Sequence, residues 1–68
     1  MDDEVFNLSL RKFLKTVGVG SQRENEQAVA KALGEKAVAG TESLPATMVL
    51  QIPALKLEVR FEGHIDLG

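Results

Sequence analysis

The chemistry open to this chain is limited by its reactive side chains, of which His64 is the only histidine. Glu62 and Asp66 flank it at two-residue spacing, which places all three side chains on one face of a strand, where they could touch one cation. The same spacing is typical of the water-facing side of any amphipathic strand. We therefore interpret the cluster as a solvated face and expect no metal site.

Nucleophilic catalysis finds no support in the sequence either. The chain contains no cysteine, which excludes thiolate chemistry, disulfides and zinc–thiolate sites. No serine lies in a G-x-S-x-G turn, and an acid–base carboxylate pair would need a cleft that a domain this small has little room to form. We expect a protein that is not an enzyme, with no catalytic residue and no cofactor.

A small basic patch is formed by Arg11, Lys12 and Lys15. Such a patch could attract phosphate groups, which supply most non-specific affinity for nucleic acid. It is equally explained by cations near the C-terminal end of a helix, where they complement the helix dipole. The whole chain carries 8 Lys and Arg against 10 Asp and Glu, so its charge of −2 favours the second interpretation.

The first element that must position these cations is a helix over about residues 4–17. Its apolar residues recur with helical period and form one stripe: Phe6, Leu10, Phe13, Leu14 and Val17. Acidic residues precede this stripe, as the positive end of a helix dipole favours. Gly18 follows it, where a left-handed residue commonly closes a helix.

A second helix is predicted over about residues 21–34. Ser21 and Glu24 have the spacing of a capping box, and an apolar run of small residues follows them. Gly34 would end this helix. The short Gly18-Val19-Gly20 connection predicts a corner similar to a helix-turn-helix, with the second helix as the nucleic-acid reader. The first turn of that reader, residues 22–26, holds two anions and one cation, which disfavours phosphate binding.

Beyond a linker at residues 35–43, the apolar period changes from 3.6 to 2. Strands are predicted over about 45–52 and 55–62, in a register that pairs Ile52 with Leu55 and Met48 with Val59. Pro53 does not suit a two-residue type I′ turn, so a four-residue turn from Ile52 to Leu55 is preferred. The second strand either continues to residue 67 or turns at Gly63 into a short third strand.

These elements predict one α+β domain over residues 1–68. An N-terminal two-helix hairpin packs on one face of a C-terminal antiparallel β-hairpin. A chain of 68 residues buries only about 60% of its unfolded surface, and such chains often depend on a partner. Leu8 and Val49 are apolar but lie off the predicted core faces, so they are the candidate interaction surface for a homodimer or another protein.

No run of about 18 apolar residues suits a membrane span, and the acidic N-terminal residues do not resemble a secretory signal. We therefore expect a cytoplasmic protein without a membrane partner.

The sequence also resembles a family of short bacterial proteins classified as a domain of unknown function. The resemblance lies in Phe6-Asn7, Ser9, Arg11 to Lys15, Val17 to Val19, Ser21 to Glu24 and the later Leu44-Pro45-Ala46. It implies a stand-alone bacterial protein and assigns no activity, cofactor or site. We expect a non-catalytic protein–protein interaction module; the alternative is a nucleic-acid-binding module with a helix-turn-helix-like corner.

Overall fold

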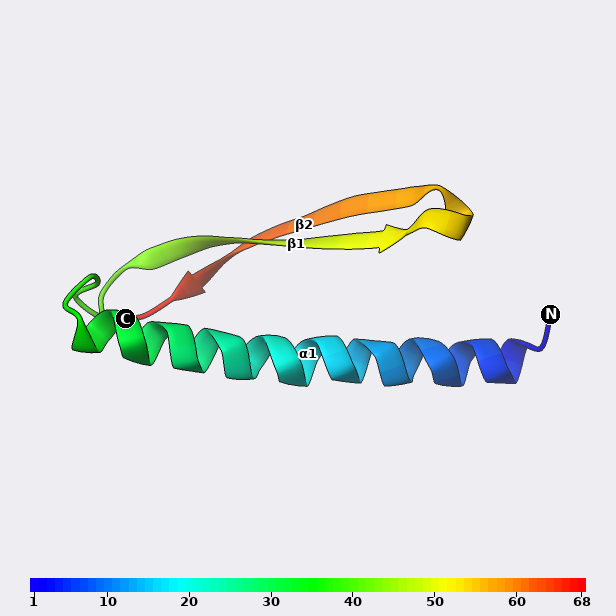
Figure 1. The fold of residues 1–68 in the computed structure, drawn as a ribbon, viewed down its shortest axis with the longest axis horizontal. Coiled ribbons are helices and arrows are strands. Elements are labelled where there is room, and N and C mark those ends of the chain that lie inside the picture. The colour runs from blue at the N-terminus through cyan, green and yellow to red at the C-terminus, as the bar shows by residue number, and fades with distance from the viewer. The chain divides into compact units, whose positions relative to one another are not determined.

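The computed structural model describes all 68 residues, which form one helix, α1, followed by a β-hairpin (Figure 1). The chain divides into two compact units, Met1–Glu35 and Lys36–Gly68. The first unit is helical and the second is a two-stranded sheet. The fold is therefore α+β, but it lacks the predicted two-helix hairpin.

Helix α1 runs without interruption over Asp3–Gly34. Asp2 caps its first turn, because its side chain accepts hydrogen bonds from the backbone N–H groups of Glu4, at 3.0 Å, and Val5, at 3.1 Å. Asp3 and Glu4 add negative charge at the positive end of the helix dipole. The 32-residue length gives a rod of about 48 Å at 1.5 Å per residue.

The predicted break at Gly18–Gly20 is wrong, because both glycines lie inside α1. Ser21 is not an N-cap: its carbonyl accepts a hydrogen bond from the Asn25 side chain at 3.0 Å, within the helix. Each interior glycine costs only about 1 kcal/mol relative to alanine, and no proline interrupts the run. Good helix formers on both sides offset that cost, so the helix continues.

The second unit is an antiparallel hairpin of β1 (Ser43–Ile52) and β2 (Leu57–Asp66). Ile52 pairs with Leu57 and Met48 with Phe61, so the predicted register is wrong by two residues. The reason lies in the turn: Pro53–Leu55 forms a 3₁₀ turn, η1, and Lys56 follows in the left-handed region at φ 52°. The loop therefore has four residues between the paired ends.

Strand β2 continues through Gly63, which pairs with Ala46, to Asp66. The alternative third strand is therefore wrong. Gly63 is accommodated in the regular ladder, and the alternation of apolar and polar side chains runs on past it.

Alternation gives the hairpin two chemically distinct faces. The apolar hairpin face consists of Leu44, Ala46, Met48, Leu50 and Ile52 from β1, with Leu57, Val59, Phe61, Gly63 and Ile65 from β2. The polar hairpin face consists of Ser43, Pro45, Thr47, Val49 and Gln51 from β1, with Glu58, Arg60, Glu62, His64 and Asp66 from β2. Neither strand has a fully buried residue, and α1 has none.

Candidate association surfaces

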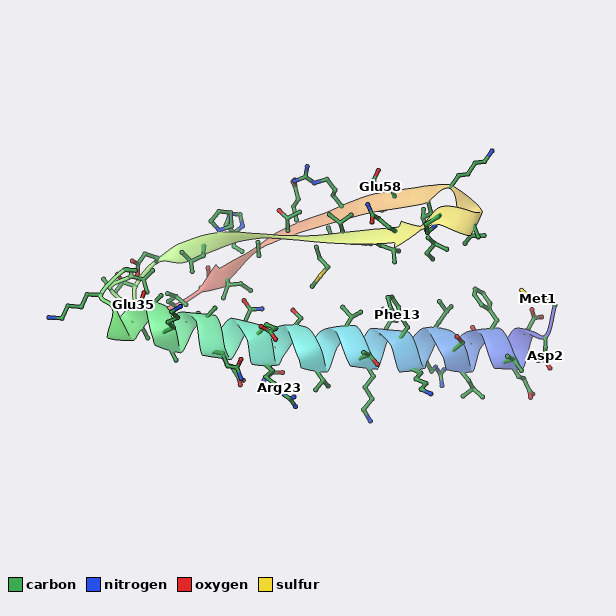
Figure 2. All side chains as sticks on the ribbon, viewed as in Figure 1. Met1, Asp2, Phe13, Arg23, Glu35 and Glu58 are labelled. Atoms are coloured by element: carbon green, nitrogen blue, oxygen red, sulfur yellow. The ribbon has the colours of Figure 1, made fainter.

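The helical unit presents one apolar surface, the helix stripe, which we define as Phe6, Leu10, Phe13, Leu14 and Val17. These residues recur every three or four positions and so lie along one side of α1. Phe13, labelled in Figure 2, is 51% exposed by its accessible surface. Leu14 is 64% exposed. Burying an exposed aromatic ring and an exposed leucine removes apolar surface from water, which is favourable. The stripe is therefore a candidate for burial against another surface.

The apolar hairpin face is the second such surface. Nine of its ten residues are apolar side chains and the tenth is Gly63. Phe61 is the most exposed of its large residues, at 58%. A two-stranded hairpin by itself is at best marginally stable in water, so this face also needs a cover.

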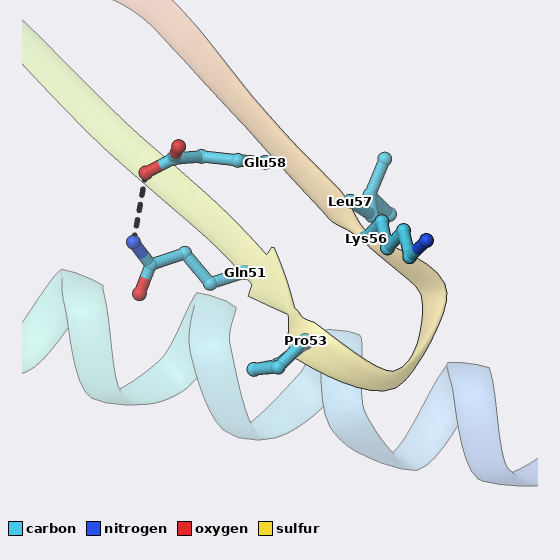
Figure 3. A pocket seen from close by; sticks show the side chains of 5 residues that line it. All are labelled: Gln51, Pro53, Lys56, Leu57 and Glu58. Carbon is cyan, nitrogen blue, oxygen red and sulfur yellow. Dashed lines mark hydrogen bonds between the residues drawn. The ribbon is translucent and has the colours of Figure 1, made fainter.

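The polar hairpin face is held by contacts between side chains on neighbouring strands. Ser43 Oγ donates to Asp66 Oδ1 at 2.6 Å, at one end of the ladder. Gln51 Nε2 donates to Glu58 Oε1 at 2.8 Å, near the turn (Figure 3). These cross-strand bonds connect β1 to β2 through side chains as well as through the backbone.

His64 lies on this polar face, across the ladder from Pro45. No group of three or more His, Cys, Asp or Glu side chains is placed to hold a metal ion. Asp66 is instead engaged by Ser43, and Glu62 lies 4.0 Å from Arg60. The geometry therefore makes His64, Glu62 and Asp66 parts of a charged surface.

One shallow depression of about 350 Å³ lies beside the hairpin turn (Figure 3). Its lining residues are Gln51, Pro53, Lys56, Leu57 and Glu58. It is broadly open to solvent, and its polar groups do not converge on an enclosed volume as those of ligand sites do.

Sequence reasoning missed Glu42, which organises the linker. Its carboxylate accepts hydrogen bonds from three consecutive backbone N–H groups: Ala39 at 2.8 Å, Gly40 at 2.9 Å and Thr41 at 3.0 Å. Gly40 adopts a φ of 99°, which lets the backbone curve around the carboxylate. The signal available in the sequence was an acidic residue directly after Ala-Gly-Thr. This composition is typical of a flexible linker, so it did not indicate an ordered turn.

The hydrogen bonds from Ala39 first, and then from Gly40 and Thr41, lower the pKa of Glu42 below its ordinary value of 4.5. Because the folded pKa is the lower one, the contribution of Glu42 to stability is complete above about pH 4.5 and is lost as the pH falls through the lowered pKa.

We expect a carboxyl ¹³C titration by NMR to give a midpoint for Glu42 below 4.5. In Glu42→Gln, the Ala39 and Gly40 amide shifts should lose that titration step. A Glu42 midpoint at or above the ordinary value would contradict the assignment.

The predicted interaction residues Leu8 and Val49 belong to different units. Leu8 is 65% exposed and lies on the side of α1 away from the helix stripe. Val49 is 48% exposed and lies on the polar hairpin face, opposite Arg60. Both are accessible, and their part in an interface stays a prediction.

The basic patch, Arg11, Lys12 and Lys15, lies on the exposed side of α1 away from the stripe. Its explanation as C-terminal charges is wrong, because α1 continues for about five turns beyond Lys15 to Gly34. The uninterrupted helix also removes the corner on which the nucleic-acid alternative depended. The patch remains as three solvated cations on a long helix.

Comparison with known proteins places this chain in a family. The sequence profile of the family of unknown function DUF6494 matches residues 1–68. The chain belongs to DUF6494. The resemblance to a domain of unknown function is therefore confirmed over the whole sequence. No curated protein and no solved structure matches it at a significant level.

The DUF6494 assignment brings no activity or ligand with it. In this DUF6494 chain, no helix combines the length and the apolarity needed to cross a membrane.

Proposed function

We propose that this DUF6494 protein is a non-catalytic protein–protein interaction module that associates with a second copy of itself. The observation that carries the proposal is the absence of any buried side chain in a chain that displays two apolar surfaces. These are the helix stripe and the apolar hairpin face. Association with a second copy would remove such surfaces from water.

Association would stabilise both units. Most helical stability in proteins comes from packing of an amphipathic face, and α1 contains two interior glycines that weaken it further. Each large apolar side chain gains about 1.5–3 kcal/mol when it is fully removed from water. A partner that binds only the folded chain adds its binding free energy to stability, which a chain of 68 residues needs.

The non-catalytic part of the proposal is supported by the open form of the depression beside the hairpin turn and by the separation of the reactive groups. The expected setting is the cytoplasm of a bacterium, an expectation that comes from the family resemblance and composition and that cell fractionation would test.

The test is native mass by size-exclusion chromatography with light scattering. Refractive index must serve for detection, because the chain has no Trp or Tyr. We expect about twice the chain mass of 7.4 kDa. Leu10→Glu should lower that mass, because it places a charge in the helix stripe. Leu8→Glu is the matched control: it places the same charge on the other side of α1 and should leave the mass unchanged.

A wild-type monomer would contradict the proposal. A dimer that Leu8→Glu dissociates and Leu10→Glu does not would move the interface from the stripe to the predicted Leu8 surface. Absorbance at 260 nm that travels with the peak would show bound nucleic acid or nucleotide and would also count against the proposal.

A further inference from the structure

Both strands of the hairpin are edge strands, but their outer edges differ. The ladder extends beyond the strands, because the Leu67 N–H donates to the Glu42 carbonyl at 2.8 Å. Hydrogen-bonded and non-hydrogen-bonded pairs alternate in an antiparallel ladder. Counting from the Glu42–Leu67 pair, the outward backbone groups belong to the odd-numbered residues of β1 and the even-numbered residues of β2.

The outer edge of β1 is interrupted by Pro45. This residue pairs with His64 at a position whose N–H would point outward, and proline has none. The outer edge of β2 has no such gap. Its outward backbone groups come from Glu58, Arg60, Glu62, His64 and Asp66, each with a free N–H and carbonyl.

We propose that β2 is the self-association edge and pairs antiparallel with β2 of a second copy, with Arg60 opposite Glu62 of the partner subunit. The proposal rests on the proposed function, since it adds to the helix stripe a backbone edge through which the same two copies meet. The product is a four-stranded antiparallel sheet in the order β1-β2-β2-β1, with a two-fold axis at Phe61.

The charges of β2 select this register. Arg60 faces Glu62 of the partner subunit, and the two-fold axis repeats this pair of opposite charges. Glu58 faces His64 of the partner subunit, whose ring N–H can donate a hydrogen bond to the carboxylate. Opposite charges directly across a sheet are favourable, and like charges are unfavourable. Sliding the pairing by one two-residue step sets Glu62 against Glu62 of the partner subunit, or in the other direction Arg60 against Arg60 of the partner subunit. Both neighbouring registers are therefore disfavoured.

The apolar side of the same register is also matched. Leu57 faces Ile65 of the partner subunit, and the two Phe61 rings meet on the axis as a non-hydrogen-bonded pair, the closer kind. Four hydrogen-bonded pairs of two bonds each give about eight new backbone hydrogen bonds. The two apolar hairpin faces become one continuous surface, because the odd-numbered residues of β2 in both copies lie on the same side.

A second copy is favoured over an unrelated partner because the strand is complementary to itself. When the outward sequence Glu58, Arg60, Glu62, His64 is laid antiparallel on its own copy, Arg60 and Glu62 meet as opposite charges in both central pairs. Arg60 and Glu62 are 66% and 72% exposed in their side chains, and their mutual distance of 4.0 Å is at the limit of an ion pair. Both groups are therefore available to a partner strand.

The first test uses charge reversal and mixing. Arg60→Glu sets an acid against Glu62 of the partner subunit, and Glu62→Arg sets a cation against Arg60 of the partner subunit. Each variant alone should therefore weaken its homodimer roughly tenfold or more. Mixing the two variants should restore the dimer, because each acidic residue then faces a cation. The Arg60–Glu62 contact within each chain stays broken in the mixture, so recovery reports on the interface alone.

The second test uses a cysteine on the axis, in a chain that has none of its own. Phe61→Cys places two sulfur-bearing residues about 4.5 Å apart between Cα atoms, a separation that a disulfide accepts. Val59→Cys is the matched control: it is on the same strand and face, but the two copies lie about 14 Å apart. Mild oxidation should crosslink the first variant and leave the second uncrosslinked.

The outcomes separate the two proposals. A wild-type monomer would overturn both. A wild-type dimer whose charge-reversed variants remain dimeric, or whose Val59→Cys crosslinks as readily as Phe61→Cys, would overturn the β2 interface and leave self-association standing.

Discussion

Replacing Gly18 and Gly20 together with alanine should stabilise the protein by about 2 kcal/mol, roughly 1 kcal/mol for each site. Both residues lie inside α1, and a Cβ built on either meets no atom within 4 Å. Alanine therefore adds helix propensity without a clash. Thermal and urea unfolding, followed by circular dichroism at 222 nm, would measure the gain.

The sign of this effect distinguishes one helix from two. If Gly18 closed a first helix in the left-handed region, alanine there would be destabilising. Gly40→Ala provides the matched control, because Gly40 does have a positive φ, of 99°, and the same substitution should cost about 1 kcal/mol. A loss of stability in the Gly18→Ala, Gly20→Ala variant would contradict the continuous helix.

The second large effect concerns the two faces of β1. Leu50→Asp places a carboxylate on the apolar hairpin face, opposite Val59, and should destabilise the hairpin by roughly 2–4 kcal/mol. Val49→Asp introduces the same charge one residue earlier, on the polar face and opposite Arg60, and should change stability by less than about 0.5 kcal/mol. Amide hydrogen exchange of β1 and β2, together with urea unfolding, would measure both.

Equal losses from the two aspartates would show that the two faces are not chemically distinct. A larger loss of stability from Val49→Asp than from Leu50→Asp would contradict the assignment of the two faces. It would favour the face that carries Val49 as the interaction surface.

The sequence predicts this fold well where a pattern has only one structural solution. Alternation of apolar and polar residues identifies two strands, because a slip of one residue would turn the apolar set toward water. It does not fix the pairing between strands as firmly. The predicted pairing of Ile52 with Leu55 and the observed pairing with Leu57 both keep the apolar residues on one face. The turn decides between them, through η1 and the left-handed Lys56.

Prediction fails at Gly18 for a related reason. A glycine after an apolar stripe indicates a helix end, but its cost inside a helix is only about 1 kcal/mol, which neighbouring helix formers offset. Ser21 and Glu24 have capping-box spacing, yet the same residues are tolerated on the side of a helix. Local signals of this size cannot decide whether a helix stops or continues.

The candidate surfaces follow a similar division. The helix stripe and the alternating strands are visible in the sequence, whereas the order of the hydrogen-bonded pairs is not. That order places Pro45, and not its neighbour, at a position where a backbone N–H would point to the outer edge. Proline has no N–H, so the edge is interrupted there. The role of Glu42 is hidden for the same reason, since it depends on a backbone curve that only the folded chain shows.

Pro45 also sets a limit on growth. A hairpin with two open edges can add copies on both sides, and repeated addition produces an endless cross-β ladder. With one edge interrupted and the other self-complementary, addition of a second copy uses the open edges of both chains and leaves only interrupted ones outside. The assembly is then a closed pair with two-fold symmetry rather than a filament. In this protein a single imino acid would separate a finite complex from a polymer.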